Sequence, residues 1–190
     1  MKRLPVILAL TAAGLFAQWG GELRFCLRSE PKTFNPMMVE DEASETIRYL
    51  SGGVLIRVNR QTQELEPELA TGWKISARGQ SITLQLRQGV VFSDGTPFSA
   101  EDVAYTMRAL MDPALHSPTG DAFRSASGTV ETQVLAADRV SITFPAPVAG
   151  LERLFDQVPI LSARSPKKEA AVLVQFAFSS VICRLISDLR

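Results

Sequence analysis

The chain has 190 residues, of which 46% are hydrophobic and 21% are charged, a balance typical of one ordinary globular domain. The 20 Lys and Arg residues equal the 20 Asp and Glu residues, so the formal net charge is zero. Because no segment concentrates positive charge into a basic stripe, the composition argues against nucleic acid as a partner.

Residues 1–17 have the pattern of a secretory signal peptide. Lys2 and Arg3 supply the positive start, and an uncharged, mostly apolar run follows from Leu4 to Phe16. A charged start, an apolar core and a small residue at the cleavage point, here Ala17, are what export requires. The alternative is a buried N-terminal helix. The signal interpretation predicts a periplasmic protein, and because no Cys follows the apolar run, we expect no lipid anchor.

The mature chain is predicted to begin with a strand and an ordered loop. Apolar and polar residues alternate from Gly20 to Arg28, which predicts the strand. Two prolines and Asn35 predict the loop over Ser29–Pro36. Asn35 can form an Asx-turn, because its side-chain oxygen is an acceptor. Two interpretations stay open, since such a loop can simply end a strand or can line a binding site.

A helix is predicted over Glu40–Leu50, with Asp41 or Ser44 as its N-cap. Glycines at 52 and 53 end it, and a short strand follows over Val54–Val58. The helix carries three apolar residues at a spacing that places them on one face. They are Ala43, Ile47 and Leu50.

The stretch Leu69–Gly95 predicts two strands joined by a turn. Gly79 lies in the first turn, where it can adopt a positive φ. Clean alternation over Ser81–Arg87 predicts a strand with one buried face. Apolar residues at Val90–Phe92 resume the strand, and Gly95 belongs to a second turn.

A helix beginning after Ser99 is predicted to follow at once. Ser99 is a favoured N-cap, and Asp102 three residues later completes a variant of the capping box. Val103, Met107 and Leu110 then recur at helical spacing. The predicted core of the domain consists of Trp73, Leu84, Leu86, Phe92, Val103 and Met107.

The next segments alternate between loops and short elements. Asp112–Gly128 is rich in Pro, Ser and Gly and is predicted to be a long loop with one turn of helix at most. Thr129–Leu135 and Val140–Phe144 predict a hairpin. Ala149–Asp156 predicts a short helix, and Val158–Leu161 predicts a strand.

The sequence offers few residues for catalysis or metal binding. His116 is the one histidine, whereas a metal site needs several converging ligands and a serine hydrolase needs a nucleophile motif that is lacking. We therefore expect an exposed loop histidine, no enzyme activity, no catalytic residue, no metal and no cofactor. Cys26 and Cys183 are expected to be unpaired thiols, although an exported chain permits a disulfide.

The central stretch and the helix after it resemble a known signature, that of the extracytoplasmic solute-binding proteins of the peptide/nickel class, family 5. These proteins serve ATP-driven (ABC) importers. The resemblance is carried, in order, by Leu69-Ala70-x-x-Trp73, Gly79, Leu86-Arg87-x-Gly89-Val90-x-Phe92-x-Asp94-Gly95-Thr96-Pro97 and Ala100-Glu101-Asp102-Val103. It implies a mixed α/β (α+β) chain, the N-terminal part of a two-lobed periplasmic-binding-protein-like class II fold.

The same resemblance implies a division of the chain. The first lobe would contribute residues 18–40, the small second domain would span 41–145, and 146–164 would return to the first lobe. Residues 165–190 do not resemble the family. Since family members continue much further, we expect a premature end, for which a frameshift is one cause. Translation of the DNA beyond the stop in all three frames tests this expectation.

The resemblance also implies a function. The chain would bind a small solute such as an oligopeptide or dipeptide, deliver it to a membrane permease of an ABC importer, and act as a monomer. The ligand-binding residues implied by the match to the loop after the first strand are Glu30, Lys32, Thr33, Phe34 and Asn35. The alternatives are a non-functional remnant, a small interaction module, or a secreted hydrolase that uses His116.

Overall fold

The computed structural model describes residues 26–127 and 129–164. The predicted signal peptide at 1–17, Cys183 and the segment 165–190 therefore lie outside the described residues. So does most of the predicted strand at 20–28, and its described part, Cys26–Arg28, is not a strand.

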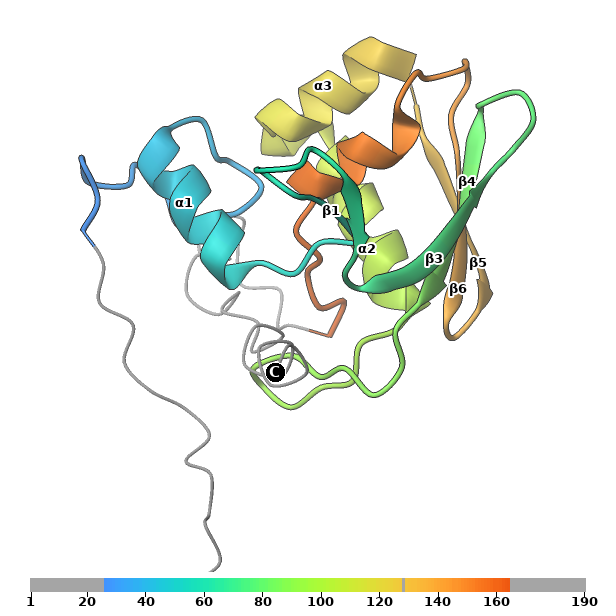
Figure 1. Cartoon of the computed structure of the whole chain (residues 1–190), viewed down its shortest axis with the longest axis horizontal. Coiled ribbons are helices and arrows are strands. Elements are labelled where there is room, and N and C mark those ends of the chain that lie inside the picture. Colours follow the sequence, from blue (N-terminus) through green and yellow to red (C-terminus); the bar gives the residue numbers. More distant parts are fainter. Residues whose placement is uncertain (1–25, 128, 165–190) are drawn as a thin grey trace, which may run out of the picture.

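A four-stranded antiparallel sheet forms the centre of the domain (Figure 1). Its strands are β3 (Ala70–Ile75), β4 (Ser81–Leu86), β5 (Glu131–Ala136) and β6 (Arg139–Thr143). Their order across the sheet is β3-β4-β6-β5, so β4 and β6 are central and β3 and β5 are the edges. Both predicted hairpins are confirmed, and Gly79 in the first turn has a φ of 65°.

The two faces of this sheet differ in polarity, as the alternation in β4 predicts. Ile82, Leu84 and Leu86 are buried on one face. The other face carries polar side chains from all four strands, because the register places Lys74 beside Thr83, Thr83 beside Ser141, and Ser141 beside Gln133. Only the first face therefore contributes to the core.

Helix α2 (Ala100–Met111) contributes Val103, Met107 and Leu110 to the same buried core as the inner face of the sheet. It begins with the predicted capping box, in which the Asp102 carboxylate accepts hydrogen bonds from the backbone N–H and the hydroxyl of Ser99, at 2.8 and 3.0 Å. The other oxygen of this buried carboxylate accepts from the backbone N–H of Ala163, at 2.8 Å. The cap thus also holds the segment that follows residue 157.

The prediction of a long loop over Asp112–Gly128 is wrong. A 3-10 turn, η1 (Pro113–Leu115), and a helix, α3 (Pro118–Ser127), occupy this segment. Packing stabilises α3, because its buried Phe123 ring stacks on Phe144 with centroids 6.1 Å apart and meets Phe155 edge-on at 6.2 Å. Tertiary contact thus overrides the weak helix propensity of Pro, Gly and Ser.

Helix α1 (Glu42–Ser51) lies to one side of the sheet (Figure 1). Asp41 caps it and Gly52 follows it, both as predicted. The predicted apolar face is only partly buried, since Ala43 is buried but Leu50 is 36% exposed. A small two-stranded sheet follows, formed by β1 (Ile56–Val58) and β2 (Leu65–Pro67), and the sequence pattern did not predict β2.

The segment after β6 completes the core. The predicted short helix is a 3-10 helix, η2 (Leu151–Gln157), whose Leu151 and Phe155 are buried. Val158–Leu161 is buried too, but it forms one bridge, between Pro159 and Val54, in place of the predicted strand. Val90–Phe92 likewise forms only a bridge, between Val91 and Pro97.

Five of the six predicted core residues are buried, and Trp73 is the exception. It packs against the core but is only half-buried, and it lies on β3, an edge strand. Within the described part of the chain, no helix is both long enough and apolar enough to span a membrane.

Candidate functional site

The loop that the sequence singles out is an ordered turn. The side-chain oxygen of Asn35 accepts a hydrogen bond from the backbone N–H of Met37 at 3.0 Å, which is the predicted Asx-turn. The backbone N–H of Asn35 donates to the hydroxyl of Thr33, also at 3.0 Å. Asn35 is only 5% exposed. Asn35 and Thr33 therefore use their side chains to shape the loop.

The other three candidate residues point outward. Glu30 and Lys32 are exposed, and Phe34 is 49% exposed, an unusual position for an aromatic ring. The loop thus exposes one negative charge, one positive charge and one apolar ring. Of the five candidates, the loop brings these three to its surface.

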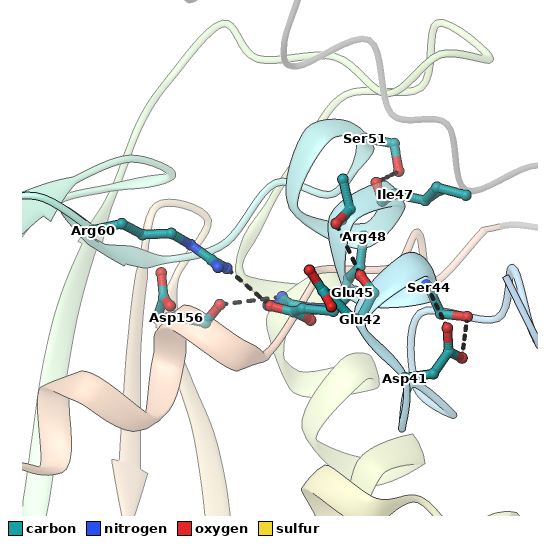
Figure 2. A network of polar contacts seen from close by, with 10 residues as sticks. Asp41, Glu42, Ser44, Glu45, Ile47, Arg48, Ser51, Arg60 and Asp156 are labelled. Carbon is teal, nitrogen blue, oxygen red and sulfur yellow. Dashed lines mark hydrogen bonds and ion pairs between the residues drawn. The ribbon is translucent and has the colours of Figure 1, made fainter. Parts of the chain in front are cut away.

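The loop is attached to the first turn of α1. The backbone N–H groups of Lys32 and Thr33 donate to the Asp41 carboxylate at 3.4 Å and to the Ser44 hydroxyl at 3.1 Å. The Asp41 carboxylate also accepts from the backbone N–H and the hydroxyl of Ser44, at 2.9 and 2.6 Å (Figure 2). These hydrogen bonds, those from Ser44 foremost, lower the pKa of Asp41.

Further along α1, a charged network joins the helix to two other parts of the domain (Figure 2). Arg48 is 5% exposed and makes a bidentate pair with Glu45, at 2.6 and 2.7 Å. Its remaining terminal nitrogen, Nη1, donates to the backbone oxygen of Asp156 in η2, at 3.1 Å. Arg60, in the turn between β1 and β2, pairs with Glu45 at 3.0 Å. The helical pattern gave no sign of this network.

A second arginine pair lies beside the network. Arg57 on β1 pairs with the buried Glu68, and Arg87 donates to the backbone oxygen of Glu68 at 2.9 Å. Burial opposes the charge on Arg57, but the hydrogen bond and charge of Glu68 outweigh it and raise the pKa of Arg57. The Arg57 and Arg60 guanidinium groups also lie over the Tyr49 ring, 4.4 and 4.3 Å from its centroid.

Residues suited to catalysis or metal binding are not gathered at this loop. His116 is exposed at the end of η1, as predicted, and Cys26 is an exposed free thiol. Within residues 26–127 and 129–164, no group of three or more His, Cys, Asp or Glu side chains is arranged to hold a metal ion.

The fold is a mixed α/β domain with an ordered, partly exposed loop that is hydrogen-bonded to α1. The chain belongs to the bacterial extracellular solute-binding proteins, family 5, whose "Middle" region it matches over residues 64–177. This family consists of solute-binding proteins. The matched range extends to residue 177 and so includes part of 165–190, the segment predicted not to resemble the family; for residues 165–177 that prediction is wrong.

Two relatives illustrate the similarity. A probable ABC transporter-binding protein of Deinococcus radiodurans is 29% identical over 140 residues, which is 72% of this chain and 23% of the relative. Di/tripeptide-binding protein 4 of Pseudomonas aeruginosa is 30% identical over 124 residues, 60% of this chain and 22% of the relative. The chain thus spans less than a quarter of the length of either protein.

Solved structures of family members show the same fold. The oligopeptide-binding protein AppA of Bacillus subtilis, in complex with a nonapeptide, aligns with a TM-score of 0.66 at 22% identity. NikZ of Campylobacter jejuni, in complex with Ni(L-His), aligns with a TM-score of 0.64 at 26% identity. These alignments cover 79% and 80% of this chain but 29% of each solved chain.

Proposed function

We propose that this chain provides part of the solute-binding component of an ABC importer, acting outside the cytoplasmic membrane, and that the solute is a short peptide. The observation that carries this proposal is the family match over residues 64–177. The choice of peptide is supported by relatives such as the di/tripeptide-binding protein of Pseudomonas aeruginosa. The importer's membrane permease would be the protein partner.

We further propose that Glu30, Lys32 and Phe34 are the side chains of this chain that contact the solute. They are exposed on a loop whose backbone is pinned by hydrogen bonds to α1. A pinned backbone lowers the entropy lost on binding, because the loop is already ordered. Thr33 and Asn35 would act indirectly, by shaping the turn.

Binding is expected to be weak in this chain alone. Small-molecule sites that bind tightly bury most of the ligand surface, and in two-lobed proteins a hinge motion closes the second lobe over the ligand. The present chain spans less than a third of the related structures it matches. The experiment must therefore detect weak, fast-exchanging complexes.

The test is a titration of the 15N-labelled chain with trialanine, followed by two-dimensional NMR. Peptide addition should shift the amide signals of residues 32–35 in a saturable manner, and Phe34→Ala should abolish the shifts. Leu135→Ala is the matched control, because Leu135 is as exposed as Phe34, at 48%, but lies on β5. Titration without any saturable shift would contradict the peptide-binding role and favour a remnant or an interaction module.

A further inference from the structure

We propose that Arg48 is a positioning residue, which fixes helix α1 onto the domain and thereby sets the place of the loop that carries Glu30, Lys32 and Phe34. The importance of this loop for solute binding rests on the function proposed above. The positioning itself is a property of the free chain and can be measured without any ligand.

The loop should move together with the first turn of α1, because it is hydrogen-bonded to that turn. Two of its backbone N–H groups, those of Lys32 and Thr33, donate to side chains in or next to the first helical turn. Asp41 and Ser44, which accept these bonds, are also bonded to each other. A movement of the first turn of α1 would therefore displace or break the hydrogen bonds that shape residues 32–35.

Apolar packing holds α1 only in part. Of its apolar face, Ala43 is buried, Ile47 is half-buried, and Leu50 is 36% exposed. Burial of apolar surface is the usual means by which a helix is held. With this face partly uncovered, polar contacts must supply more of the attachment.

Arg48 supplies such a contact from a buried position. Its guanidinium reaches the backbone oxygen of Asp156 in η2. The Asp156 carboxylate in turn accepts from the backbone N–H of Val58 on β1, at 2.9 Å. The contact therefore leads from α1 through η2 to the small β1–β2 sheet, and none of these elements carries the candidate loop.

Arginine is the side chain that this geometry requires. The pair with Glu45 uses two donors of one guanidinium edge and leaves Nη1 directed at Asp156. A planar guanidinium can make all three bonds at once, whereas a lysine ammonium has no such fork. Glu45 also offsets the cost of burying the arginine charge.

One other contact fixes the loop from its far end. The hydroxyl of Ser117, just before α3, donates to the backbone oxygen of Met37 at 2.6 Å. The loop is thus held near Met37 by α3 and, through α1, by Arg48. Loss of Arg48 should free the half that includes residues 32–34 and leave the Ser117 contact in place.

Hydrogen–deuterium exchange of the full 190-residue chain tests this proposal. We expect Arg48→Gln to accelerate exchange of the Thr33, Ser44 and Glu45 amides together by about tenfold, the effect of losing one charge-assisted hydrogen bond from a local opening equilibrium. Amides of β4 and β6 should keep their rates. Arg60→Gln is the matched comparison: it removes a more exposed contact between α1 and the turn after β1, made to Glu45 and Tyr49, and should accelerate these amides less.

A second variant, Ser44→Ala, separates the loop from the helix. It should accelerate the Thr33 amide far more than the Glu45 amide, because the hydroxyl accepts from Thr33 and donates to Asp41 but takes no part in the contact between Arg48 and η2. If Arg48 merely added to overall stability, the two variants would not be expected to differ in this way at the Thr33 and Glu45 amides.

The results that would overturn the proposal are equally specific. They are unchanged Thr33 exchange in Arg48→Gln, an equal acceleration in β4 and β6, or the same effect from Arg60→Gln. If circular dichroism shows Arg48→Gln to be unfolded, Glu45→Gln replaces it, with a smaller acceleration of the same amides. Unfolding of both variants would also refute the proposal, since Arg48 would then serve the whole core. None of these outcomes depends on trialanine binding.

Discussion

Glu45 is the carboxylate that both Arg48 and Arg60 contact, and its ionisation should make the stability of the domain depend on pH. Burial alone would raise the pKa of Glu45, but the hydrogen bonds and charges of Arg48 and then Arg60 outweigh it and lower the pKa. A lowered pKa in the folded state means that the unfolded state binds more protons in this range. The stabilisation is therefore complete above the ordinary glutamate pKa of about 4.3 and is lost as the pH falls through the lowered value.

The measurement is urea denaturation at pH 7 and pH 3.5. We expect Glu45→Gln to lower the free energy of unfolding at pH 7 and to change less than the unaltered chain on acidification. Glu42→Gln is the control, because Glu42 lies in the same helical turn, is exposed, and is outside the Arg48 and Arg60 pairs. An equal loss on acidification in all three chains would contradict the assignment.

At the level of single residues, the sequence predicts turns and helix caps better than it predicts long-range contacts. The Asn35 turn, the Asp41 and Ser99 caps, and the positive φ at Gly79 follow from local properties of those residues. The burial of Arg48 does not, because its partner in η2 is 108 positions away. A charged residue on a short amphipathic helix is ordinarily expected to be exposed.

Helices α2 and α3 are packed so closely at Gly120 that one added methyl group at this position should destabilise the domain. A Cβ at Gly120 would lie 2.1 Å from the backbone oxygen of Leu110, which belongs to α2. We expect Gly120→Ala to destabilise the chain by roughly 1–3 kcal/mol, the usual cost of overpacking. Thermal unfolding should show a melting temperature several degrees lower.

Gly72→Ala is the control for this prediction. Gly72 is also in a regular element, β3, but nothing lies within 4 Å of the position its Cβ would take. Its melting temperature should stay within about a degree or rise slightly, because alanine reduces the freedom of the unfolded chain. Equal behaviour of the two variants would mean that α2 and α3 are not in close contact.

Elements were predictable where local pattern and tertiary environment agree. The alternation in β4 and the capping box of α2 indicate structures that packing then completes. In α3, Pro118 and Gly120 favour a loop locally, and a single aromatic residue, Phe123, provides much of the reason for the helix. That ring's partners are Phe144, directly after β6, and Phe155 in η2, so no local window reveals them.

On the scale of the whole molecule, the core is continuous from Met37 to Leu161. Phe155 is fully buried and lies in η2, after the last strand of the sheet. We expect Phe155→Ala to cost about 3–5 kcal/mol through lost burial and the cavity it leaves. Because small domains have a total stability of only about 5–15 kcal/mol, the urea midpoint should fall by about a fifth or more.

Phe34→Ala is the matched control, since it removes the same ring from an exposed site. Its free energy of unfolding should change by no more than about 0.5 kcal/mol. A loss in Phe155→Ala as small as that in Phe34→Ala would show that the segment after β6 is not part of one cooperative core.

The location of the candidate site could be predicted from the sequence, but the residues that hold its loop in place could not. The proline-bounded loop and its turn are evident from Ser29–Pro36, and the family resemblance suggests the candidate residues. That Asn35 faces inward while Phe34 faces outward depends on the packing of Asn35 and Met37. The residues that hold the loop, Arg48 and Ser117, are identified only by tertiary contacts.

The strand order also bears on how the domain is made. Strand β4 pairs with β3 on one side and with β6 on the other, and the hydrogen-bonded side chains of Gln85 and Asp138 are 53 positions apart. At translation rates of 5–20 residues per second, the ribosome needs roughly 3 to 11 s to add that length. During this interval the β3–β4 hairpin emerges with one edge unpaired. A nascent-chain chaperone that shields open strand edges would therefore meet this hairpin before the sheet is complete.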